Sequence, residues 1–423
     1  MDFLRLPEVP RFRLENLKIP ATFLGESGDF APFALTIEGD RVAEGPAEVT
    51  LDLRGRILLP CFTDMHTHLD KGHIWERSPN PDGTFAGALA SVRADREARW
   101  SAEDVHRRMD FALRAAYAHG TRAIRTHLDS LPPQDSITWP VFREMRQEWR
   151  GRIELQAVCL VPVDLVEKEG PFAAIADCVR ESGGVLGCVA FPIPDLEDRL
   201  ETFFRMAEAR HLAADFHVDE TGDPAAAGLH AIARTVLRSG FEHPVTVGHC
   251  CSLAVQGRFE AEHTLDLVAE AGLSVVSLPM CNLYLQDRMA GRTPRWRGVT
   301  LVHEMAARGI PVAFASDNTR DPFYAYGDLD MLEVMREATR IAHLDHSKED
   351  WPLAFSTTPA DLCGFGLSAF APGHAADFLI FNARSWTELF ARPQSDRILV
   401  RDGRQIERRL PDYAELDDLM EAR

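Results

Sequence analysis

Residues 57–68, ILLPCFTDMHTH, form an apolar, β-rich run that ends in two histidines separated by a single residue. Side chains of a β-strand alternate between its two faces, so His66 and His68 would point to the same side. A run of this kind followed by a helix predicts one βα unit of a parallel sheet. Two imidazoles aimed at one point are typical of a metal site, although a surface loop could carry such a pair by coincidence.

Seven more β-rich runs follow along the chain, and helical patterns lie between them. The runs are 121–129, 153–162, 184–194, 213–220, 245–250, 273–282 and 310–318. Among the helical patterns, the one after Ser101 begins with a good N-cap residue and ends at Gly120. The alternation predicts an α/β fold, a (β/α)8 TIM barrel over residues 59–365. An open doubly wound sheet is the alternative, but no G-x-G-x-x-G motif follows the first strand.

The two ends of the chain carry short strand patterns instead of βα units. The first end contains a predicted hairpin turn at residues 38–41, EGDR, and the second a turn at Asp402 and Gly403. Neither end has enough strands to bury a core alone. We therefore expect residues 1–58 and 366–423 to form one small β-sandwich domain together. The tail 411–423, PDYAELDDLMEAR, predicts an acidic surface helix.

Composition and charge narrow the classes of partner. The chain has 423 residues, and its 46 basic and 65 acidic side chains give a net charge of −19. Such acidity argues against nucleic acid or an anionic membrane as a partner, because both would be repelled. Eight cysteines are scattered without a C-x-x-C motif, which is typical of buried thiols in a reducing compartment. We expect a cytoplasmic homo-oligomer with neither a leader peptide nor a membrane span.

Polar side chains concentrate where the predicted strands end, which is where a TIM barrel carries its active site. The first strand ends in His66 and His68, the fifth in His217, and the eighth in Asp317. Imidazole and carboxylate groups are good ligands for a borderline divalent ion, and these four would leave a position for water. The ion would lower the pKa of that water to about 7 and supply hydroxide.

Two more residues at strand ends suit acid–base work beside this ion. Glu220 follows the fifth strand and could shuttle the proton of the water without binding the metal. His249 ends the sixth strand and could form a hydrogen bond with the hydroxide or with the oxygen of a tetrahedral intermediate. A core histidine bonded to a backbone carbonyl would give the same pattern as His249.

These segments resemble a known family. PCFTDMHTH, FHVDE, GHC and ASDN resemble the amidohydrolase superfamily, and HTHLD, RTHLD, FHVDE, NLYLQDR and DPFYAYGDLDML resemble its bacterial cytosine deaminase group. The resemblance implies one zinc or iron ion per chain, bound by His66, His68, His217 and Asp317. It also implies that Glu220 shuttles protons and that His249 and Asp317 position or deprotonate the water.

Two absent motifs refine this interpretation. Members of the superfamily with two metals usually carry a carboxylated lysine on the fourth strand, and GVLGCVAFPIP at 184–194 has none, so we expect a mononuclear site. The H-x-E and P-C-x-x-C signature of the deaminases that act on bases in nucleic acids is also missing.

Departures from the cytosine deaminase pattern concern the substrate. Asn318 replaces a second aspartate, Phe323 replaces a tryptophan, and residues 161–163 replace a glutamine that grips substrate. Lys71 is more similar to the isopropylammelide amidohydrolases. We expect a deaminase of a small amino-substituted heterocycle, cytosine or 5-methylcytosine. The alternatives are an aminotriazine such as N-isopropylammelide, another cyclic amidine, or an inactive scaffold for protein association.

Three polar residues keep two interpretations each. Asn318 could bind substrate or cap a helix, and Lys71 could bind substrate or be a surface charge. His127 could orient a metal ligand or only cap the end of its strand.

Overall fold

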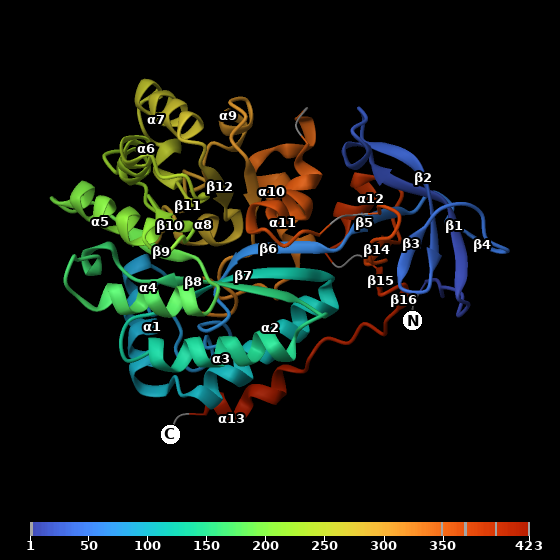
Figure 1. Cartoon of the computed structure of the whole chain (residues 1–423), viewed down its shortest axis with the longest axis horizontal. Coiled ribbons are helices and arrows are strands. Elements are labelled where there is room, and N and C mark those ends of the chain that lie inside the picture. The colour runs from blue at the N-terminus through green and yellow to red at the C-terminus, as the bar shows by residue number, and fades with distance from the viewer. Residues whose placement is uncertain (1–2, 348–349, 368–369, 394–395, 422–423) are drawn as a thin grey trace.

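The computed structural model describes residues 3–347, 350–367, 370–393 and 396–421. Helices surround a set of central strands, and a sheet built from both ends of the chain lies beside them (Figure 1). The blue and red segments of this sheet are far apart in sequence and adjacent in space (Figure 1). We call the strands β6 to β13 with their helices the parallel-strand region, and the sheet at the right of Figure 1 the terminal sheet.

The parallel-strand region contains one strand within each of the eight predicted β-rich runs. These strands are β6 (Phe62–Thr67), β7 (Thr121–Asp129), β8 (Glu154–Leu160), β9 (Leu186–Ala190), β10 (Ala214–Val218), β11 (Val245–His249), β12 (Ser274–Ser277) and β13 (Val312–Phe314). They pair in parallel as β6-β7-β8 and as β9-β10-β11-β12-β13. The α/β class with parallel strands is therefore confirmed.

Parallel bridges join the two groups of strands at both edges. Val158 of β8 pairs with Val185, the residue before β9, and Thr67 of β6 pairs with Asp317 in the segment after β13. Because all these pairings are parallel, the C-terminal ends of the eight strands lie on the same side. The residues that follow the strands are thereby brought together.

Helices connect the strands and pack on their outer faces. They are α1 (Phe85–Arg99), α2 (Ala102–His119), α3 (Asp135–Glu148), α4 (Pro171–Glu181), α5 (Leu196–Glu208), α6 (Gly228–Ser239), α7 (Arg258–Glu270), α8 (Pro279–Leu285), α9 (Val302–Ala306), α10 (Met331–Ala342) and α11 (Thr357–Cys363). The predicted caps of α2 are confirmed. The side chain of Ser101 accepts a hydrogen bond from the backbone of Asp104, and Gly120 ends the helix with a φ of 98°.

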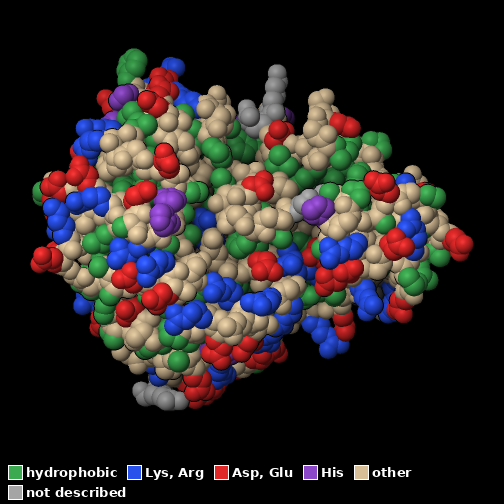
Figure 2. All heavy atoms as spheres, in the orientation of Figure 1, with side chains coloured by type: hydrophobic (Ala, Val, Ile, Leu, Met, Phe, Trp, Pro, Cys, Tyr) green, Lys and Arg blue, Asp and Glu red, His purple; other side chains and the backbone are tan. Residues whose placement is uncertain are grey.

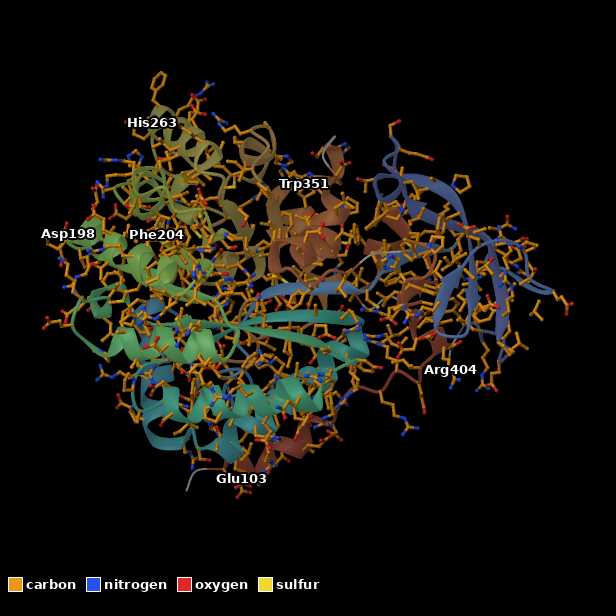
Figure 3. All side chains as sticks on the ribbon, in the orientation of Figure 1. Glu103, Asp198, Phe204, His263, Trp351 and Arg404 are labelled. Carbon is orange, nitrogen blue, oxygen red and sulfur yellow. The ribbon has the colours of Figure 1, made fainter. Side chains whose placement is uncertain are left out.

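Aromatic packing fixes helix α5 against the strands. Phe203 and Phe204 of α5 contact Phe216 of β10, with ring centroids 4.6 and 5.7 Å apart. Phe204 is buried, whereas Asp198 of the same helix is exposed (both labelled in Figure 3). Burying a side chain of this size contributes about 1.5–3 kcal/mol. This packing holds the strand that carries His217 in place.

The terminal sheet is one mixed sheet whose strands come from both chain ends. Its strands are β1 (Arg11–Pro20), β2 (Phe30–Glu38), β3 (Arg41–Ala43), β4 (Val49–Asp52), β5 (Ile57–Pro60), β14 (Phe378–Phe381), β15 (Arg397–Arg401) and β16 (Arg404–Gln405). The order is β16-β15-β14-β5-β1-β2-β3, with β4 beside β1. Both predicted turns, at 38–41 and at Asp402 and Gly403, join paired strands. The two packed sheets of a sandwich remain a prediction.

Alternating residues of the terminal sheet serve two different cores. Ile57 and Leu59 of β5 pack in the large hydrophobic cluster of the parallel-strand region. Leu58, which points to the other face, packs with Leu14 and Ile37 in a cluster of the sheet itself. Strand β5 thus packs against both cores. It ends at Pro60, where a single residue separates it from β6, and so connects the terminal sheet to the strand that carries His66.

The C-terminal tail contains shorter helices than predicted, a 3-10 turn over Tyr413–Leu416 and α13 (Asp417–Met420). It lies against α2 and not against the terminal sheet (Figure 1), because Arg107 pairs with Asp418 and Arg114 with Glu415. A short helix, α12 (Trp386–Ala391), precedes β15.

The described surface is charged, and most of the cysteine thiols are buried, as the sequence predicted. Acidic and basic side chains are interspersed over the face drawn in Figure 2. All eight cysteines are free, and seven of them are buried. Among the described residues, none of the helices has the length and apolar character needed to cross a bilayer.

Candidate active site

Four side chains converge at the C-terminal ends of β6, β10 and β13. The Nε2 atom of His217 lies 3.1 Å from that of His66 and 3.3 Å from that of His68. The Oδ1 atom of Asp317 lies 3.6 Å from the Nε2 atom of His66 and 3.3 Å from that of His68. The structure thus brings together all four residues that the sequence suggested as metal ligands.

The donor set suits a divalent ion. An ion with bonds of about 2.0–2.1 Å and angles of about 90–120° separates neighbouring ligand atoms by roughly 2.8–3.6 Å, which matches the spacings between these side chains and leaves a fifth position for water. Both carboxylate oxygens of Asp317 are buried and accept no hydrogen bond from the described residues. Burial and the neighbouring imidazoles hold the pKa of His66 and His217 well below the ordinary value, so both rings are neutral and have lone pairs that a metal could use.

Two residues of the candidate site have unusual backbone conformations. His249 and Asp317 have φ angles of 68° and 65°, in the left-handed region that side chains other than glycine rarely adopt. Both lie where a strand passes into a loop. Such conformations persist only when the surrounding structure holds them, and they cluster at functional sites.

Glu220 lies beside Asp317 and His249. Its Oε1 atom is 3.4 Å from the Nδ1 atom of His249, and its carboxylate is within 4.8 Å of that of Asp317. Burial, reinforced by the nearby Asp317, raises the pKa of Glu220 well above its ordinary value. Burial also raises the pKa of Asp317 to about 7. A cation between the two carboxylates would offset their repulsion.

Lys71 is buried, which rules out the interpretation as a surface charge. Its Nζ atom lies 2.9 Å from the Oδ1 atom of Asp129, whose other oxygen accepts a hydrogen bond of 2.8 Å from Arg96. The same Nζ atom lies 5.7 Å from the ring centroid of Phe323. The two predicted substrate residues Lys71 and Phe323 therefore face each other.

Asn318 is buried and does not cap any helix in the described part of the chain, since the next helix begins at Met331. Its side-chain nitrogen donates a hydrogen bond of 2.7 Å to Asp321. Its carbonyl oxygen accepts a contact of 3.5 Å from the thiol of Cys281. One amide hydrogen is left for another acceptor.

His127 lies directly beside a metal-ligand candidate. Its ring packs against that of His66 at a tilt of 34° with centroids 3.9 Å apart, and its Nε2 atom is 3.1 Å from the Oδ1 atom of Asp215. Arg125 also pairs with Asp215 at 3.1 Å. This arrangement favours the orienting interpretation of His127 over a simple strand cap.

Sequence reasoning missed two buried residues of the site. Asn282 of α8 contacts both Glu220 and His249, and Asp321 holds Asn318. Asn282 lies in the segment NLYLQDR and Asp321 opens DPFY, so the resemblance already pointed at both segments. Neither residue ends a β-strand, which is the signal that identified the others.

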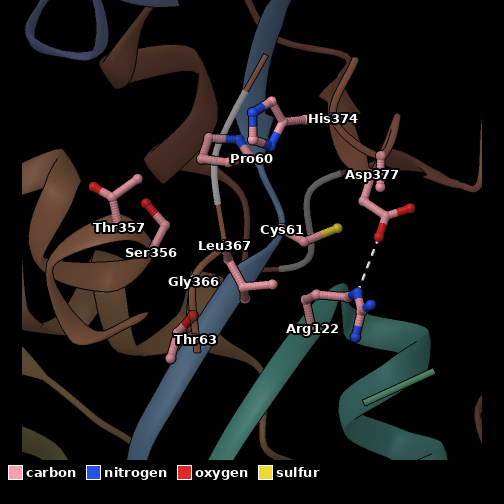
Figure 4. Close-up of a pocket in the computed structure, with 11 residues that line it drawn as sticks. Pro60, Cys61, Thr63, Arg122, Ser356, Thr357, Gly366, Leu367, His374 and Asp377 are labelled. Carbon is pink, nitrogen blue, oxygen red and sulfur yellow. Dashed lines mark hydrogen bonds and ion pairs between the residues drawn. The ribbon is translucent and has the colours of Figure 1, made fainter. Parts of the chain in front are cut away.

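A separate cavity of about 120 Å³ lies near the other end of β6, between the parallel-strand region and the terminal sheet (Figure 4). Cys61, Thr63 and His374 line it, and the ion pair between Arg122 and Asp377 closes one side (Figure 4). None of the predicted site residues takes part in it.

The model of the Amidohydrolase family matches residues 163–406. Over its full length, the chain is 53% identical to a pterin deaminase from Rhizobium rhizogenes, of which it covers 99%. The chain belongs to the amidohydrolase family. It is a hydrolytic aminohydrolase that acts on the C–N bond of a heterocycle, which agrees with the predicted class of enzyme and not with an inactive scaffold.

More distant members of the amidohydrolase family share the fold. A 5-methylcytosine deaminase from Klebsiella pneumoniae superposes with a TM-score of 0.79 at 23% identity, covering 95% of this chain and 98% of that one. An N-isopropylammelide isopropylaminohydrolase from Burkholderia multivorans superposes with a TM-score of 0.74 at 25% identity, with coverage of 94% and 98%. Amidohydrolases typically depend on divalent metals, and the histidine and aspartate groups described above could hold one.

Proposed function

We propose that this protein deaminates a pterin, a 2-amino-4-oxopteridine, by hydrolysis. The observation that carries the proposal is the 53% identity with a pterin deaminase from end to end. Water adds to the carbon that bears the amine, the C–N bond breaks, and ammonia leaves while an oxo group forms on the ring. The reacting ring is a 2-amino-4-oxopyrimidine, the isomer of cytosine in which the amine and oxo groups exchange places. The proposal therefore differs from the predicted cytosine in the position of the amine as well as in the second ring.

In this proposal His66, His68, His217 and Asp317 hold one zinc or iron ion. The ion would supply Lewis-acid chemistry, lowering the pKa of a water to about 7. The spacings of the four side chains and the unpartnered oxygens of Asp317 support this assignment.

Glu220 is the proton carrier of the proposal. It takes a proton from the attacking water and gives one to the leaving amine, and its raised pKa suits a group that must hold a proton during the reaction. His249 donates a hydrogen bond to the oxygen that becomes the oxo group. Its neutral ring, with a pKa lowered to about 3 by burial and by the nearby His127, suits a donor and not an acid.

Lys71, Asn318 and Phe323 form the proposed substrate wall. The ammonium group of Lys71 can donate to a ring carbonyl, and the remaining amide hydrogen of Asn318 can donate to a ring nitrogen. The ring of Phe323 gives the flat substrate an apolar surface, and Phe85 packs on it with centroids 5.4 Å apart. Cytosine, 5-methylcytosine and an aminotriazine share the flat ring and are the competing substrates.

Release of the amine tests the substrate, measured as ammonia for the amino-substituted rings and as isopropylamine for N-isopropylammelide. Purified protein is assayed with pterin, cytosine, 5-methylcytosine, isocytosine and N-isopropylammelide, with His217→Ala as the inactive control. We expect kcat/KM for pterin to exceed that for each monocycle by about 100-fold or more, because the second ring adds apolar contact worth about 2–3 kcal/mol. A higher kcat/KM for cytosine or 5-methylcytosine would return the assignment to the monocyclic substrate.

We also propose the finer architecture. The bridges at both edges of the parallel strands support a closed (β/α)8 barrel over residues 59–365. The strands shared by both chain ends support a second domain within residues 1–58 and 366–423, from which the tail at Tyr413–Met420 departs to pack on α2. Light scattering on the purified protein tests the expected homo-oligomer.

A further inference from the structure

Asn282 lies between two proposed catalytic groups that come from different strands. Its side-chain nitrogen is 3.2 Å from the Oε1 atom of Glu220 and 3.0 Å from the Nδ1 atom of His249. The residue is 1% exposed and sits within helix α8, where its backbone carbonyl accepts a hydrogen bond from Gln286. The amide is therefore rigidly held.

The donors and acceptors of this trio match in number. A primary amide has two N–H groups on one nitrogen, and here both have a partner. An N–H that points at the Nδ1 atom of His249 requires a lone pair there, so the proton of the neutral ring is on Nε2. The competing arrangement is a direct bond from Nδ1–H of His249 to Glu220. Its distance of 3.4 Å is longer than an ordinary hydrogen bond.

The tautomer decides what His249 can do. A ring nitrogen of His249 lies within 4.8 Å of those of His66 and His217, close enough for three histidines to share an ion. Its Nε2 atom is buried and has no partner among the described residues. With a proton there, Nε2 is a hydrogen-bond donor and cannot be a metal ligand.

We propose that Asn282 is a positioning residue that fixes the tautomer of His249. It keeps His249 out of the metal's coordination sphere, presents its Nε2–H to the reacting oxygen, and holds the carboxylate of Glu220 at the same time. This inference rests on the proposed metal-dependent deamination, but it does not depend on which heterocycle is the substrate.

The test replaces Asn282 with an isosteric group of opposite polarity. In Asn282→Asp the new carboxylate shares a proton with the adjacent Glu220 and accepts a hydrogen bond from His249, so it draws the ring proton of His249 to Nδ1 and frees the Nε2 lone pair for the metal. Cobalt(II) is loaded in place of the native ion, and its visible absorption reports the number of ligands without any turnover. We expect the absorption of Asn282→Asp to change in intensity and position, and the double variant with His249→Ala to restore the original spectrum.

The matched control is Gln286→Glu, the same amide-to-acid change one turn along the chain. Gln286 contacts the backbone oxygen of Glu220 and not His249, so its cobalt spectrum should stay as in the unaltered protein. If Asn282→Asp does not fold, Asn282→Ala removes the amide donor without adding charge and is judged by the same spectrum.

Kinetics give a second, separable readout. With the heterocycle that the protein turns over fastest, we expect Asn282→Asp to lose roughly 10²-fold or more in kcat with KM changed less than about threefold. A spectral change that His249→Ala reverses supports the inference even if pterin is not a substrate. A variant with an unaltered cobalt spectrum and unaltered kcat overturns it.

Discussion

Glu220 is the residue at which acid–base chemistry can be separated from metal binding. Its carboxylate contacts Asn282 and His249 and is absent from the four-ligand set. We expect Glu220→Gln to keep its metal and to lose roughly 10² to 10⁴ in kcat, the usual contribution of a general acid–base group. Turnover and metal content are measured on the same preparation. Normal turnover would assign proton transfer to His249 or Asp317.

His217 is one of the four proposed metal ligands, so its removal should affect metal binding as well as turnover. Its Nε2 atom is the one that both His66 and His68 approach. We expect His217→Ala to lose metal and activity together, and the unaltered protein to hold close to one zinc or iron ion per chain. Elemental analysis measures both. Two tightly bound ions per chain would contradict the mononuclear site.

At the scale of the element, Gly248 of strand β11 has no side chain, and this leaves space for the ring of His66 from strand β6. A Cβ atom on Gly248 would lie 3.0 Å from Cε1 and 3.2 Å from Nδ1 of His66, closer than ordinary contact. We expect Gly248→Ala to push this imidazole by a few tenths of an ångström and to weaken metal affinity about 10- to 100-fold, as when a ligand's support is lost. Competition with a chelator measures the affinity.

The control for this change is Gly170→Ala, whose new Cβ would have only an ordinary contact of 3.6 Å with Glu167. It should leave metal affinity as it is. Equal affinities in the two variants would show that the space beside His66 is not needed.

Elements whose pattern is local in the sequence could be predicted, whereas contacts between distant segments could not. The strands and the convergence of His66, His217 and Asp317 were predictable because apolar runs are local, and the ends of parallel strands lie together. The contacts of Asn282 were not, because they depend on how α8 packs over the strand ends. The burial of Lys71 could not be predicted for a similar reason, since its partner Asp129 lies at the end of β7, far away in the sequence.

At the scale of the molecule, one buried ion pair joins the terminal sheet to the parallel-strand region. Arg397 of β15 contacts both carboxylate oxygens of Asp330, the N-cap of α10, at 2.7 and 2.6 Å. Removing one partner of such a pair leaves a buried charge and costs about 3–5 kcal/mol. We expect Arg397→Met to lose roughly this much stability at pH 7 in urea unfolding. The control Arg384→Met, at an exposed pair with Glu388, should change little.

The stability that this pair contributes should also depend on pH in one direction. Burial by itself raises the pKa of Asp330, but the guanidinium of Arg397 and the nearby His119 outweigh it and hold the pKa below the ordinary 3.8. A carboxyl group with a depressed pKa stabilises the folded state above its unfolded pKa, and this contribution is lost as the pH falls towards the folded value. The difference in unfolding free energy between the unaltered protein and Arg397→Met should therefore be constant from about pH 5 to 8 and shrink below about pH 4. Urea titrations of both proteins across this range measure it, and a difference that grew on acidification would mean that Asp330 is not the partner that matters.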